Sequence, residues 1–131
     1  MVGCSEPVDD EQQIRDLVAQ MVKGVETKEL SQTLAPVHED FLGNKHMRRA
    51  NLRGVILVHN RRHKNLHVFV NDLNVTLDGD MAQVTCNVAL AGRDKILPER
   101  GRILKVESRW QKLDGEWFVM EANWKDPLYS P

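Results

Sequence analysis

The stretch QKLDGEWFVMEANW, residues 111–124, decides the fold. Asp114-Gly115 at its centre is a dipeptide that favours a two-residue β-turn, and strand-forming residues flank it on both sides. We therefore predict a hairpin whose first strand covers about residues 102–113 and whose second strand begins after Gly115. Such a turn pairs Leu113 with Glu116.

Counting outward from this turn gives the register of the predicted hairpin. The pairs Trp110–Val119 and Ser108–Glu121 then share one face with Lys112–Trp117 and Val106–Asn123. That face is apolar near the turn and polar farther from it, as the lining of a cavity and its mouth would be. The candidate ligand-binding residues are Ser108, Trp110, Trp117, Val119, Glu121, Asn123 and, from an earlier strand, Asn71.

Glu121 is the candidate catalytic residue of this face. A half-buried carboxylate can act as a general acid or base, or it can orient a polar ligand. His67 is its candidate partner if the first predicted strand keeps the alternation of Leu73 and Val75, and His59 is the alternative. A bulge would change that alternation. In the structural alternative, Glu121 pairs with an arginine of the third predicted helix and closes the fold.

The opposite face of the hairpin is the candidate interaction surface. Phe118, Met120 and Trp124 would form an exposed apolar patch beside Arg109, of the kind that marks partner sites. We expect a homodimer through this convex face of the sheet. Alternatively, Lys and Arg stems cover the patch.

The rest of the chain is consistent with one domain. It has 131 residues and a net charge of −1, which does not favour nucleic acid as a partner. We assign residues 1–8 to a flexible tether and 9–131 to the domain. The tether's Gly3-Cys4 resembles the end of a bacterial lipobox, so we expect a lipid on Cys4, an envelope or periplasmic location and membrane contact through that lipid, with a cytoplasmic protein as the alternative.

Three helices precede the strands in the predicted order. Asp9 or Asp10 can cap a first helix whose apolar residues recur from Ile14 to Val25, Thr27 can cap a second one that ends before Pro36, and Asn44 can cap a third over about 45–63. Alternating strands flank Asp78-Gly79-Asp80, and the final hairpin completes four. The fold class is therefore α+β, with three N-terminal helices packed on a curved four-stranded antiparallel sheet.

Several segments resemble the nuclear transport factor 2-like (SnoaL-like, cystatin-type cone) superfamily, and small bacterial envelope members above all. They are HEDFLGN, VTLDGDMAQV, LPERGR and RWQKLDGEWFVMEANW, and the resemblance covers about residues 10–126. It implies a cone-shaped fold that hosts enzymes, ligand binders and scaffolds. Its isomerase-like and dehydratase-like enzymes use a pocket Tyr, whereas the one tyrosine of this chain is Tyr129, near the C-terminus.

A basic segment follows residue 44. No acidic residue lies between Phe41 and Asn71, while seven cations do: Lys45, Arg48, Arg49, Arg53, Arg61, Arg62 and Lys64. A solvated face is the common outcome, and an anionic membrane or nucleic acid is the alternative. His59, His63 and His67 are spaced for a helical metal site, but the surrounding charge disfavours a dication, so we expect no metal and no cofactor.

From these observations we expect a small-ligand-binding cone domain of the bacterial envelope that does no chemistry. A proton-transfer enzyme, isomerase-like or hydratase-like, that uses Glu121 and a protein-interaction module are the alternatives. The residues alone leave open whether the chain is an enzyme.

Overall fold

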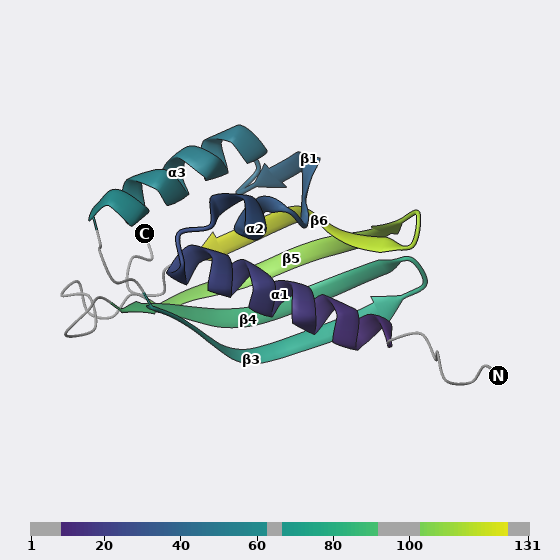
Figure 1. Ribbon diagram of the computed structural model, residues 1–131. Helices are drawn as coiled ribbons and strands as arrows, with labels where there is room; N and C mark the ends of the chain where they lie inside the picture. Colours follow the sequence, from purple (N-terminus) through teal and green to yellow (C-terminus); the bar gives the residue numbers. More distant parts are fainter. Residues whose placement is uncertain (1–8, 63–66, 92–102, 126–131) are drawn as a thin grey trace.

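The computed structural model describes residues 9–62, 67–91 and 103–125, and its helices lie on one side of a single sheet (Figure 1). The helices are α1 (Asp10–Glu26), α2 (Leu30–Leu34) and α3 (Arg49–Arg62). The strands are β1 (Val37–Gly43), β2 (Met47–Arg48), β3 (His67–Asp78), β4 (Met81–Ala91), β5 (Ile103–Leu113) and β6 (Glu116–Lys125).

The sheet has six strands in the order β2-β1-β6-β5-β4-β3. The β1–β6 pair is parallel and the other pairs are antiparallel. The α+β class is confirmed, but the prediction of a four-stranded antiparallel sheet is wrong. The missed strand β1 carries Val37 and Phe41, which are 3% and 2% exposed, and its three polar residues in succession conceal the alternation.

The first helix begins and ends at side-chain caps. The carboxylate of Asp9 accepts a hydrogen bond from the Glu11 amide at 3.3 Å, so the predicted N-cap is confirmed. Thr27, predicted to cap the second helix, instead ends α1, where its hydroxyl donates to the Lys23 carbonyl at 2.9 Å. No helix among the described residues is long and apolar enough to cross a membrane.

The third helix begins four residues later than predicted because residues 44–45 form a turn. Asn44 and Lys45 have φ of 47° and 68°, a left-handed conformation that reverses the chain between β1 and β2. Asn44 is therefore not a helix cap. Its amide donates to the Ala122 carbonyl and its side-chain oxygen accepts from the Trp124 amide, both at 2.9 Å, which joins this turn to β6.

The hydrophobic core lies between α1 and the face of the sheet that we call the inner face. Its buried members come from every layer: Ile14, Leu34, Val37, Phe41, Ala82, Val84, Trp110, Trp117, Val119 and Ala122. We call the opposite face, which is turned away from the helices, the outer face. Because side chains alternate along a strand, the register decides which residues reach each face.

Two β-bulges in the antiparallel part of the sheet change that alternation. In β6, Val119 pairs with Trp110 and Glu121 pairs with Arg109, which leaves Met120 as the extra residue. In β3, the register shifts between Asn71 and Asn74, and Asp72 there has a φ of 55°. Beyond each bulge, residues that an unbroken alternation would place on one face lie on the other.

Candidate functional site

Part of the predicted ligand-binding face belongs to the core. Trp110 and Trp117 are each 2% exposed and Val119 is 4% exposed, so their side chains belong to the core. The Trp110 indole donates to the Ser108 hydroxyl at 2.9 Å, and that hydroxyl donates to the Val84 carbonyl at 3.2 Å. Ser108 therefore satisfies the polar group of a buried tryptophan and does not face a carboxylate.

The Met120 bulge places Glu121 and Asn123 on the outer face. The predicted pairs Ser108–Glu121 and Val106–Asn123 are wrong, because the structure pairs Ser108 with Ala122 and Val106 with Trp124. Glu121 lies beside Arg109, with 3.4 Å between Oε1 and Nε, and its side chain is 35% exposed. The inner face therefore stays apolar beyond the bulge, and the predicted Glu121–His67 acid–base pair is not assembled there.

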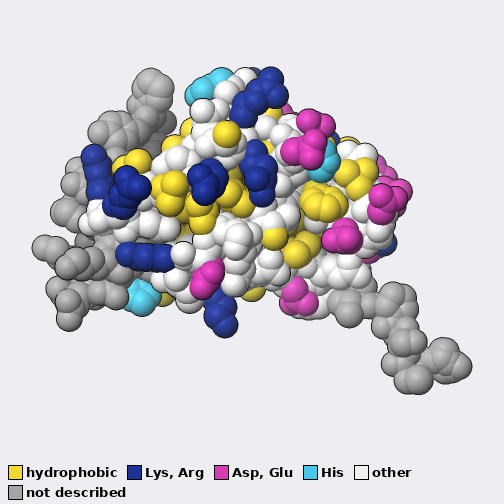
Figure 2. Space-filling model, turned by 45° about the horizontal axis from the view of Figure 1, so that its top comes forward, with side chains coloured by type: hydrophobic (Ala, Val, Ile, Leu, Met, Phe, Trp, Pro, Cys, Tyr) yellow, Lys and Arg dark blue, Asp and Glu magenta, His cyan; other side chains and the backbone are white. Residues whose placement is uncertain are grey.

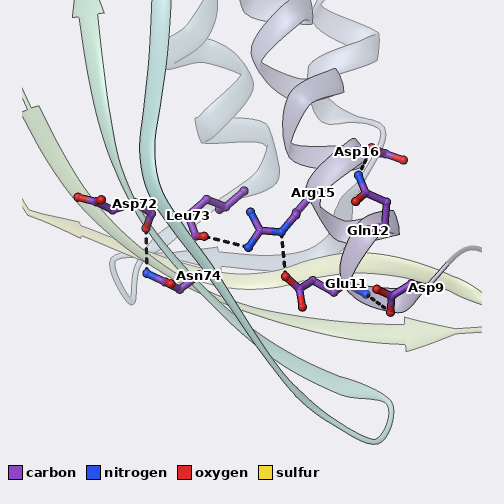
Figure 3. Close-up of polar contacts among 8 residues, drawn as sticks. All are labelled: Asp9, Glu11, Gln12, Arg15, Asp16, Asp72, Leu73 and Asn74. Carbon is purple, nitrogen blue, oxygen red and sulfur yellow. Dashed lines mark hydrogen bonds and ion pairs between the residues drawn. The ribbon is translucent and has the colours of Figure 1, made fainter.

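The β3 bulge moves His67 and Asn71 to the outer face as well, so neither faces the hollow that their predicted parity implied. Figure 3 shows the groups that lie on the two sides of the edge strand β3. The Arg15 guanidinium of α1 donates to the Leu73 carbonyl at 3.1 Å, while Asp72 and Asn74 point away from the helix. His67 is half exposed, and its Nδ1 lies 3.9 Å from Oε2 of Glu26.

The predicted dimer patch is divided by the same bulge. Trp124 lies on the inner face, where it contacts the core and covers Gly43, so its assignment to the outer patch is wrong. Met120 occupies the bulge. Phe118 and Arg109 remain on the outer face, and the Phe118 ring meets His38 edge-on with 5.7 Å between ring centroids.

A carboxylate that was predicted only as a possible helix cap connects the first helix to the last hairpin. Oδ1 of Asp10 accepts hydrogen bonds from the Trp117 indole and from the Lys112 ammonium, each at 3.1 Å. The hydrogen bond from Trp117, followed by the hydrogen bond and the positive charge of Lys112, holds the pKa of Asp10 below its ordinary value. This contact orients α1 and is structural.

Three of the cross-strand rows of side chains on the outer face follow one another along the sheet, as the strand register shows. The apolar row is Phe69, Ala89 and Ile103. The lysine row is Asn71, Asn87, Lys105 and Lys125. The amide row is Asn74, Thr85, Glu107 and Asn123.

A groove of about 830 Å³ lies over the lysine row and the amide row, and seven of their eight members, all but Asn71, line it. Asn44, Lys45 and Asp72 complete its polar lining. Asp72 is held in place, because one carboxylate oxygen accepts from the Asn87 amide at 3.0 Å and its carbonyl accepts from the Asn74 amide at 3.1 Å. We call this the outer groove, and its size is within the range of small-molecule sites.

The charges in the outer groove are not balanced. Lys105 and Lys125 are direct cross-strand partners, so two ammonium groups come from facing positions on neighbouring strands. Within the described part of the chain, neither they nor Lys45 has an ion-pair partner. This pair was not predictable from the sequence, because Lys105 and Lys125 face each other only in the shifted register.

Two further polar groups lie on the helix side of the sheet. Asn60 on α3 is 9% exposed, and its side-chain oxygen is buried without a hydrogen-bond partner among the described residues. Cys86 is half-buried, and burial raises the pKa of its thiol, which disfavours the reactive thiolate. Neither group has a catalytic partner among the contacts described above.

The histidine spacing does not build a metal site in the part of the chain that the structure describes. Residues 9–62, 67–91 and 103–125 contain no cluster of three His, Cys, Asp or Glu side chains that could hold an ion. His63 and Cys4 lie outside the described residues, so the lipid prediction for Cys4 stays a prediction.

Comparison with known proteins gives the fold. No protein-family model matches the chain and no curated protein matches it in sequence. Among solved structures, an NTF2-like protein of unknown function from Pseudomonas putida superposes with a TM-score of 0.80 at 15% identity, over 94% of this chain and 90% of that one. The chain has the nuclear transport factor 2-like (NTF2-like) fold.

Two other structures support the NTF2-like assignment. A protein of unknown function with a cystatin-like fold from Nostoc punctiforme has a TM-score of 0.75 at 14% identity, over 95% of this chain and 96% of that one. ActVI-ORFA from Streptomyces coelicolor has a TM-score of 0.72 at 14% identity, over 95% and 100% of the two chains. Identities this low carry the fold alone, so the function of this NTF2-like chain has to be argued from its own residues.

Proposed function

We propose that this NTF2-like domain is a non-catalytic binding protein for a small anionic molecule, which it takes up in the outer groove. The observation that carries the proposal is the cross-strand pair Lys105–Lys125. Like charges directly opposite each other destabilise a sheet. A local arrangement that costs stability is expected where function requires it.

The rest of the groove supports an oxygen-rich anion as the ligand. Lys45 adds a third ammonium group, while Asn74, Asn123 and Thr85 supply neutral hydrogen-bonding groups. Glu107 and Asp72 can accept hydrogen bonds from hydroxyl or amino groups of the same ligand. A small organic molecule with a carboxylate or a phosphate and several hydroxyl groups fits this lining.

Acid–base chemistry has less support than binding. Glu121, the carboxylate that the enzyme alternative requires, is paired with Arg109 on the outer face and does not line the groove. Glu107 and Asp72 line the groove without a histidine beside them. A binding role needs only the lysine and amide rows.

The test is one substitution that should move two measurements in opposite directions. Lys125→Glu replaces the repulsion of Lys105 with attraction, so the free energy of unfolding should rise by about 0.2–1 kcal/mol. The same change should abolish stabilisation by anions in a thermal-shift screen with inorganic phosphate, citrate and a hexose phosphate. A ligand at about 100 times its Kd should stabilise the wild-type protein by about 2.7 kcal/mol.

Lys23→Gln is the matched control, because Lys23 is an exposed lysine of α1 outside the groove. It should leave every thermal shift unchanged. If no anion stabilises the wild-type protein, or if Lys125→Glu keeps the shift, the outer groove is not the binding site.

We also propose a second copy of this chain as a partner for the outer face. The observation in its favour is the apolar row, in which Phe69 is 54% exposed and Ile103 is 47% exposed. A hollow of about 370 Å³ beside it is lined by Ala89, Ile103, Asn71, Asp72 and Asn87. An exposed aromatic ring next to a hollow on the same face is an arrangement that a two-fold dimer can use reciprocally.

A further inference from the structure

Helix α3 carries a concentration of positive charge without a counter-charge. Arg53, Arg61 and Arg62 are exposed, and Arg48 precedes the helix directly. Within the described residues none of them forms an ion pair. The first turn of α3 contains no acidic residue, so the positive end of the helix dipole adds to the field of Arg48.

Apolar side chains lie on the outward surface of the same helix. Val55 is 41% exposed and Val58 is 48% exposed. They are three residues apart, and Arg62 follows Val58 by four residues, so the valines and this arginine form one stripe. Figure 2 shows Lys and Arg side chains gathered together with hydrophobic side chains on this part of the molecule.

The inward side of α3 is fixed to the domain. Leu52 and Ile56 pack against the core. Arg49 donates to the carbonyls of Val37 and Leu34 at 2.9 and 3.0 Å. The helix therefore has apolar groups on both sides, and only the inner ones are covered by the described chain.

We propose that the outward surface of α3 docks on an anionic phospholipid surface, a role separate from the outer groove. A helix in a membrane interface buries apolar side chains at the level of the acyl boundary while its basic residues meet the lipid phosphates. Val55 and Val58 would enter that boundary, and Arg53, Arg61 and Arg62 would lie at the phosphates. Nucleic acid would use the arginines but leave the exposed valines without a function.

The test is co-sedimentation with vesicles. The wild-type protein should bind vesicles that contain about 30% phosphatidylserine and should not bind pure phosphatidylcholine. Each cation near an anionic surface strengthens binding about 5-fold, so Arg61→Gln/Arg62→Gln should bind about 30-fold more weakly. Val55→Ser/Val58→Ser, which keeps every charge, should also bind more weakly.

The control Lys23→Gln/Arg109→Gln removes the same charge from α1 and from the outer face. It should keep the affinity of the wild-type protein, and circular dichroism should show that all variants are folded. Equal losses in the control and the α3 variants would overturn the proposal, because general charge would then explain binding. Tighter binding to a DNA or RNA duplex that ignores Val55→Ser/Val58→Ser would overturn it in favour of nucleic acid.

Discussion

A single oxygen atom of Asp10 holds the first helix to the final hairpin. It accepts from both Trp117 and Lys112, so the indole of a tryptophan that is 2% exposed has a partner. A buried indole N–H without an acceptor would cost the free energy of desolvation. The contact also places a carboxylate in the first turn of α1, where the helix dipole favours it.

Asp10→Asn should make the free energy of unfolding less dependent on pH in the acidic range. The pKa of Asp10 is lowered from 3.8 in the folded protein, so its contribution is present above pH 3.8 and is lost as the pH falls through the lowered pKa. The wild-type protein should therefore be more stable than the variant near neutral pH, and the difference should vanish in acid. Urea unfolding over a pH series measures this.

Asp16→Asn is the control on the same helix. Its amide oxygen can still accept the hydrogen bond that Gln12 donates to Asp16 at 2.9 Å. Its pH profile should follow the wild-type protein. A difference between Asp10→Asn and the wild-type protein that stays constant down to strong acid would contradict the account of the Asp10 contact.

At the scale of elements, two helical glycines should respond to alanine in opposite ways. A Cβ on Gly24 would lie 2.7 Å from the Thr33 amide nitrogen, where α1 meets α2, whereas a Cβ on Gly54 would meet nothing within 4 Å. Gly24→Ala should cost about 1–3 kcal/mol of unfolding free energy through overpacking. Gly54→Ala should raise the free energy of unfolding by up to about 1 kcal/mol, because alanine has the higher helix propensity. Thermal unfolding of both variants measures this, and a gain from Gly24→Ala would contradict the close contact.

The final hairpin shows how far sequence could predict an element. The turn and its first pairs were predictable, because Asp114 and Gly115 adopt φ of 50° and 82° and Leu113 pairs with Glu116. The register beyond Trp110 was not, because a bulge adds one residue without a required sequence. The apolar pattern did contain a signal, since Ala122 and Trp124 are out of phase with Val119 and only a bulge brings both inward.

Deletion of Met120 tests the role of this bulge. Without the extra residue, Glu121 follows Val119 directly. An unbroken alternation therefore still places Glu121 opposite Arg109 on the outer face and Trp124 on the inner face. We therefore expect the deletion variant to fold with a cooperative unfolding transition. Denaturant unfolding compares it with Met120→Ala, which keeps the bulge, and the two variants should have similar stability. A deletion variant without a cooperative transition would show that the hairpin needs the bulge itself and not only the facing of its residues.

At the scale of the whole molecule, the order of the helices and of the last four strands was predictable from local patterns. The parallel pairing of β1 with β6 was not, because it joins segments that lie far apart in the sequence, and β1 has a weak alternation of its own. The outer groove depends on this parallel pairing and on the bulge in β6. The β1–β2 turn brings Lys45 to the lysine row, and the bulge in β6 places Asn123 and Lys125 on the outer face.

The oligomeric state is the prediction that belongs to this scale. A stable interface buries about 800 Å² of each partner, and the apolar row supplies its apolar centre. Size-exclusion chromatography with light scattering should give the wild-type protein twice the monomer mass. Phe69→Asp/Ile103→Asp should have the monomer mass while remaining folded. Val58→Asp, which changes a comparably exposed valine on α3 (48%), should stay dimeric. A wild-type protein that is monomeric at every concentration would leave the outer face free for the small anion alone.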